Sequence, residues 1–120
     1  MGNFYSYIDP EKYFVGKTII EGELEFAPYE DVEPVWGSST YDGKVRFYMN
    51  NGDILIGNVP YPEYQTYGFE DIYNVEVVKV NRHIEIIRWL GFDWDIRTCY
   101  ILTDKNDSTY ELPIYGLVIQ

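Results

Sequence analysis

Apolar and polar residues alternate most clearly over residues 44–59 (KVRFYMNNGDILIGNV). Val45, Phe47 and Met49 occupy every second position of the first half, and a second apolar run follows in the other half. The Asn51-Gly52 pair between the two runs tolerates the positive φ angles that tight hairpin turns require. The stretch therefore predicts a β-hairpin, and we expect the remaining strands to be arranged around it.

Alternation with the same period continues over residues 17–26 and predicts a strand with one apolar face and one acidic face. The even-numbered residues make up the predicted apolar face, which includes Ile20 and Leu24. The odd-numbered residues place Ile19 on the other face together with three carboxylates: Glu21, Glu23 and Glu25. A strand does not need three acids in a row on one face to fold, so this face is a candidate binding surface.

Shorter apolar runs predict five more strands, at residues 75–80, 83–90, 97–103, 109–112 and 114–119. Residues 84–90 would also suit a short helix that ends at Gly91. Residues 81–82 are expected to form the turn between the first two of these strands, and residues 92–95 a corner. Asp9-Pro10-Glu11 has the residues of a helix start and predicts one short N-terminal helix. The chain is therefore expected to be mostly β: a single domain (1–120) that forms a small antiparallel sandwich or partly open barrel of about seven short strands.

The charge of the chain narrows the class of partner. Its formal net charge is −11 at pH 7. Proteins that bind nucleic acids or anionic membranes concentrate Lys and Arg, so direct binding to either is not expected. An acidic surface instead speeds encounter with a basic protein. The competing interpretation is that the negative charge only keeps the protein soluble.

The acids are unevenly distributed, and residues 21–33 hold six of them without a single Lys or Arg: Glu21, Glu23, Glu25, Glu30, Asp31 and Glu33. Pro60 and Pro62 disfavour a regular strand or helix at residues 60–69, and this predicted loop supplies three tyrosines as candidate contact residues: Tyr61, Tyr64 and Tyr67. Tyrosine is enriched at interface hot spots because it offers a large contact area with few rotatable bonds. The same tyrosines could instead pack against one end of a barrel.

Catalytic and metal-binding signals are weak. His83 is the only histidine, and it could pair with Cys99 only if their two strands adjoin. Asp104–Ser108 imitates the start of a calcium-binding loop but is followed by Thr109 where that loop requires glycine, so a hairpin turn is expected. Asp93 and Asp95 could form a carboxylate pair, although most such pairs at corners are solvated. No enzymatic activity, cofactor or metal is predicted.

The longest apolar runs fall far short of the roughly 20 residues that span a bilayer. The N-terminus lacks the pattern of a signal peptide, and Cys99 is the only cysteine. The expected compartment is therefore the cytoplasm.

The leading functional hypothesis is a non-enzymatic acidic inhibitor, of the toxin-immunity or phage anti-defence type, that docks on a basic protein such as a nuclease. The alternative is a domain that binds a small ligand, a nucleotide or sugar, through an aromatic loop and the residues Trp36, Trp94, Arg88 and Arg97. A third possibility is a structural component that assembles through its sheet edges. Both a monomer and a small homo-oligomer are compatible with the leading hypothesis.

Overall fold

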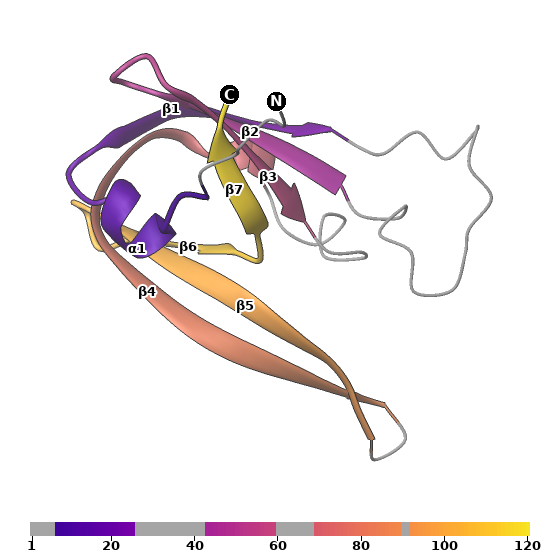
Figure 1. The fold of residues 1–120 in the computed structure, drawn as a ribbon. Coiled ribbons are helices and arrows are strands. Elements are labelled where there is room, and N and C mark those ends of the chain that lie inside the picture. Colours follow the sequence, from indigo (N-terminus) through magenta and orange to yellow (C-terminus); the bar gives the residue numbers. More distant parts are fainter. Residues whose placement is uncertain (1–6, 26–42, 60–68, 90–91) are drawn as a thin grey trace.

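The structure is a computed structural model that describes residues 7–25, 43–59, 69–89 and 92–120, with the backbone alone at residues 25, 70, 85–89 and 92–97. Seven strands dominate it (Figure 1). The elements in chain order are helix α1 (Pro10–Tyr13), β1 (Thr18–Glu25), β2 (Gly43–Met49), β3 (Ile54–Val59), the 3₁₀ helix η3 (Phe69–Asp71), β4 (Tyr73–Trp89), β5 (Phe92–Asp104), β6 (Thr109–Leu112) and β7 (Tyr115–Ile119).

All seven strands belong to one antiparallel sheet with the order β6-β5-β4-β1-β2-β3-β7. The two edge strands, β6 and β7, are consecutive in the chain and are joined by Pro113 and Ile114, both of which are buried. The sheet curls so that its two edges approach, but β6 and β7 do not pair. The fold is thus a partly open barrel with one short helix, which confirms the predicted fold class.

The core lies inside the curl of the sheet. Phe14, which follows α1, and Phe47 of β2 are both fully buried, and their rings meet edge to face with centroids 5.9 Å apart. On the outer side of α1, the Tyr13 hydroxyl donates a 2.5 Å hydrogen bond to Asp53 in the turn between β2 and β3. The helix is thereby fixed to the predicted hairpin at residues 44–59, which the structure confirms as β2 and β3.

The predicted strand at residues 17–26 is confirmed as β1, but the predicted faces at its start are wrong. Ile19 is fully buried opposite Met49, whereas Ile20 is 40% exposed. The pairing with β2 shifts between Ile19 and Glu21, because Ile20 is an extra residue that forms a β-bulge. A bulge reverses the alternation on its two sides, so Ile19 and Leu24 both face the core despite their opposite parity.

The expected turn at residues 81–82 and the expected corner at residues 92–95 are also wrong. Residues 73–89 form one continuous strand, β4, which pairs with β5 from Val77 to Trp89. Among the described residues, Asn74 and Asp107 are the only non-glycine residues with positive φ, so residues 81–82 have no conformation suited to a tight hairpin turn. The distal halves of β4 and β5 project from the body as a two-stranded hairpin (Figure 1).

Because of the bulge at Ile20, we expect substitutions at the two adjacent isoleucines to have different effects on stability. Ile19→Ala is expected to reduce the free energy of unfolding by about 2–5 kcal/mol, because it leaves a cavity in the core. Ile20→Ala is expected to cost less than about 1 kcal/mol, because that side chain is partly solvated. Urea unfolding of both variants measures the difference. Equal losses, or a larger loss at Ile20, would contradict the position of the bulge.

Candidate binding surfaces

The structure describes only part of the predicted acidic surface. Glu21 and Glu23 lie on the outer side of β1, and the backbone of Glu25 pairs opposite Lys44. The other predicted residues of this surface lie outside the described residues: Glu30, Asp31, Glu33, Tyr61, Tyr64 and Tyr67. Glu21 and Glu23 are therefore the predicted acids whose surroundings can be analysed.

The structure also describes only part of the alternative ligand site. Trp36 lies outside the described residues. Arg88 and Arg97 belong to the projecting hairpin, where the strand register places them opposite Asp93 and Glu85. Trp94 is in β5 of the same hairpin, and only the backbone is described at all three positions on it. A ligand site built from these residues remains a prediction.

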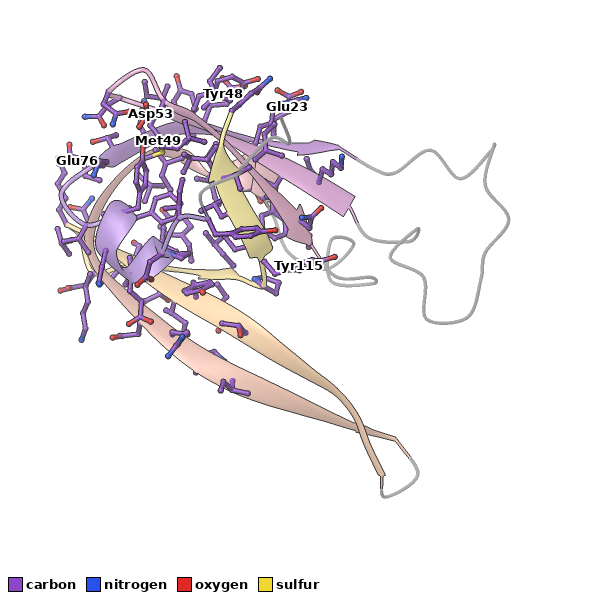
Figure 2. All side chains as sticks on the ribbon, viewed as in Figure 1. Glu23, Tyr48, Met49, Asp53, Glu76 and Tyr115 are labelled. Carbon is purple, nitrogen blue, oxygen red and sulfur yellow. The ribbon has the colours of Figure 1, made fainter. Side chains whose placement is uncertain are left out.

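Glu23 is held by two side chains of the neighbouring strand β2. The Tyr48 hydroxyl donates a 2.9 Å hydrogen bond to Glu23 Oε2, and the two side chains lie near each other in Figure 2. Arg46 Nη1 lies 4.0 Å from Glu23 Oε1. The side chains of Arg46 and Glu23 are 29% and 44% exposed, so this ion pair is solvated and contributes little to stability. Its main effect is to orient the carboxylate on the surface.

Two tyrosines that the sequence reasoning missed lie beside these acids. The register places Glu21 opposite Tyr48 of β2 on one side and opposite Tyr73 of β4 on the other. Tyr73 is 68% exposed. We call Glu21, Glu23, Tyr48 and Tyr73 the acidic–tyrosine face. Alternation within β2 could have indicated that Tyr48 points outward, but the position of Tyr73 depends on the pairing of β1 with β4.

The hydrogen bond to Glu23 also changes the acidity of Tyr48. It raises the pKa of Tyr48 above the ordinary value of 10.0, because a carboxylate acceptor stabilises the protonated phenol. Partial burial and the charge of Glu23 raise this pKa further, whereas the charge of Arg46 opposes the shift. Tyr48 is therefore a neutral hydrogen-bond donor at all physiological pH values.

The strands of His83 and Cys99 do adjoin, and the register places the two residues directly opposite each other. Cys99 is fully buried and His83 is partly buried. Because a nucleophilic thiol must be reached by its substrate, the burial of Cys99 favours a structural role for this residue.

The Asp104–Ser108 stretch forms the hairpin turn that the sequence predicts. Asp104 Oδ1 accepts hydrogen bonds from the backbone N–H groups of Asn106 and Ser108, at 2.8 and 2.9 Å. The carboxylate that would begin a calcium loop instead stabilises the turn. Within residues 7–25, 43–59, 69–89 and 92–120, no three His, Cys, Asp or Glu side chains are grouped in a way that could hold a metal ion.

A pocket of about 420 Å³ opens where the two edges of the sheet fail to meet. It combines tyrosine rings with aliphatic side chains and is lined by Tyr7, Ile8, Pro10, Tyr100, Ile114, Tyr115, Gly116 and Leu117. We call it the seam pocket. None of its lining residues was among the predicted site residues. The sequence gives no signal for it, because the pocket arises from the way the sheet remains open.

Comparison with models of protein families, with curated proteins and with solved structures gives no match. Among the described residues, none of the helices has the length and apolar character needed to cross a membrane.

The contact between Tyr48 and Glu23 can be tested by titration. Glu23→Gln is expected to lower the pKa of Tyr48 toward 10.0, because the charged acceptor is removed. In the unmodified chain the contact is present at neutral pH and is lost as the pH rises through the raised pKa of Tyr48. NMR detection of the Tyr48 ring carbon follows the ionisation. Glu76→Gln, on β4, is the control; an unchanged Tyr48 pKa in the Glu23→Gln variant would show that the bond does not form in solution.

Proposed function

We propose that this chain is a non-enzymatic binding protein that docks the acidic–tyrosine face on a basic protein partner. The proposed class is an inhibitor, of the toxin-immunity or phage anti-defence type, that acts in the cytoplasm on a nuclease or another nucleic-acid-binding effector. An acidic protein suits such a target because it can occupy the positive cleft that normally receives phosphates. The acids of residues 30–33 and the tyrosines of residues 61–67 lie outside the described residues and remain predicted contributors to binding.

The observation that supports the proposal most directly is the combination of acids and tyrosines on three neighbouring strands. Glu21 lies between Tyr48 and Tyr73 in the register, and Tyr73 leaves 68% of its surface exposed. A tyrosine this exposed does not stabilise the core in proportion to its size. Tyrosine is enriched at protein interfaces, and the carboxylates beside it would attract and orient a basic partner.

Arg46 does not weaken this argument. Its Nη1 atom lies 4.0 Å from Glu23 Oε1, and Glu21 is the second carboxylate of the face. Tyr48 and Arg46 already orient the Glu23 side chain in the free protein. Glu23 therefore loses less conformational entropy when a partner binds. The face would thus present one carboxylate in a preset position and one that can adjust to the partner.

The experiment begins with the protein as bait in lysates of its source organism and of that organism's phages or competitors. Capture is compared at about 50 mM and about 500 mM salt, because screening differs several-fold between them. The proposal expects one basic protein that is captured at low salt and weakened at high salt. Capture of nothing at either salt would contradict the proposal and favour the small-ligand alternative.

Glu21→Lys is the decisive variant for the captured protein. It is expected to weaken binding by about tenfold or more, mainly through a slower association rate and a smaller salt dependence. Glu111→Lys is the matched control, because it makes the same charge change at an exposed strand position outside the face. Association and dissociation rates of both variants are measured with the immobilised partner. Equal losses would mean that net charge alone drives binding, and this would refute docking through the face.

A further inference from the structure

The seam pocket owes its existence to the topology of the sheet. Strand β6 ends at Leu112, which pairs with Tyr100 of β5, and the chain then leaves the sheet to start β7 on the opposite edge. Among the described strands, none therefore pairs with this edge of β5 before Tyr100, on the side that faces β7. The Tyr7–Ile8 segment and α1 fill part of this space: the Ile8 N–H donates to the Leu117 carbonyl at 2.8 Å, and Tyr7 bridges to Val118. The volume that they leave unfilled is the pocket.

Three tyrosines from separate parts of the chain converge on this hollow. Tyr7 precedes α1, Tyr100 lies in the middle of β5, and Tyr115 begins β7. Tyr7 is 76% exposed and Tyr115 is 42% exposed, so both rings remain accessible at the mouth of the pocket. In Figure 2, Tyr115 lies well apart from Glu23 and Tyr48, so the seam pocket is distinct from the acidic–tyrosine face.

Gly116 keeps the space beside Tyr7 and Tyr115 open. Its φ of +62° is in the region that L side chains rarely adopt, and a Cβ at this position would lie 3.0 Å from Asn58 Nδ2 and 3.7 Å from the Tyr7 ring. A residue with a side chain would therefore be strained and would crowd the N-terminal segment.

Two carboxylates and one guanidinium act on the Tyr100 side of the pocket, whereas Lys44 lines an adjoining hollow that shares Tyr7 and Tyr115 with it. Asp9 caps α1 by accepting the Glu11 N–H at 3.0 Å, and it lies between two lining residues in the chain. Glu11 Oε1 lies 3.3 Å from Nε of Arg82, the residue that the register places opposite Tyr100. Two carboxylates thus accompany one guanidinium that is already paired, and the chain as a whole carries a net charge of −11.

These carboxylates also act on the phenol of Tyr100. Burial is the largest cause that raises the pKa of Tyr100 above 10.0; Arg82 opposes the shift, and Asp9 and Glu11 add to it. Tyr100 is therefore a neutral phenol at physiological pH, with a ring and a hydroxyl that a ligand can contact.

We propose that the seam pocket binds an organic cation, a guanidinium or alkylammonium group. Aromatic rings attract such cations through their quadrupole, and Arg-type groups also stack on them. The nearby carboxylates favour a cation and repel a phosphate or carboxylate ligand. A volume of about 420 Å³ is in the range of small-molecule sites and exceeds what one such group fills. The cation can therefore come from a free small molecule or from the arginine side chain of a peptide.

NMR titration of the full chain tests the proposal, with the backbone amides of Ile8, Gly116 and Leu117 as reporters. Agmatine represents the free cation, and acetyl-Gly-Arg-Gly-amide represents an arginine side chain. The citrulline analogue of the peptide and methyl glucoside are the neutral probes. Saturable shifts at the reporters with a cationic probe, and affinity at least about fivefold weaker for the neutral probes, are expected. Tighter binding of the peptide than of agmatine would identify a peptide as the source.

Two variants separate the contributions of charge and ring. Asp9→Asn combined with Glu11→Gln removes two charges but retains a good helix cap, and it is expected to weaken binding of the cationic probe by about fivefold or more. Asp71→Asn combined with Asp107→Asn makes the same charge change at exposed sites outside the pocket lining and is expected to leave binding unchanged. Tyr7→Ala removes a mostly exposed ring and is expected to weaken binding without unfolding the chain.

The proposal is overturned if neutral probes bind as tightly as cationic ones, if inorganic phosphate shifts the reporters more strongly, or if no probe shifts them at millimolar concentration. Equal losses in the two charge variants would also overturn it, because they would assign the effect to net charge. None of these results bears on the acidic–tyrosine face, which is tested with Glu21→Lys.

Discussion

The described residues include only short helices to cover the sheet, so the seven-stranded sheet buries its apolar face by curling over it, and the curl stops before the edges pair. The core is therefore completed by a segment that is not a strand. Phe14, carried in by the short helix, is fully buried against Phe47, and Ile8 is bonded to Leu117 at the edge of β7. The position of α1, the hollow beside it and the exposure of Tyr7 all follow from this unclosed edge.

Features of the sequence that act locally predicted the structure well. The Asn51-Gly52 turn, the alternation on either side of it and the turn that begins at Asp104 all specify their conformation within a few residues. The failures arose where the outcome depends on pairing with a distant strand. The bulge at Ile20 is set by the register of β1 on β2. The continuation of β4 through residues 81–82 without a turn is set by its long pairing with β5.

The same distinction applies to the functional surfaces. The sequence located Glu21 and Glu23 on the outer side of a strand, because alternation after the bulge is regular. It could not locate Tyr73 beside them, since β1 and β4 are joined by pairing between residues more than fifty positions apart. The seam pocket could not be predicted from the sequence, because its lining residues come together only in the folded sheet, at the edge where β6 and β7 do not pair.

The projecting hairpin has a mechanical consequence. Strands β4 and β5 run without a break from the distal end of the hairpin into the body, where β4 pairs with β1 and β5 with β6. A force on the distal end is thus carried along two covalent backbones and a ladder whose register shifts twice, between Val77 and Lys79 and between Ile87 and Arg88. Because the same two strands form the hairpin and part of the sheet, a force on the far end of the hairpin would be transmitted to the strands that line the core.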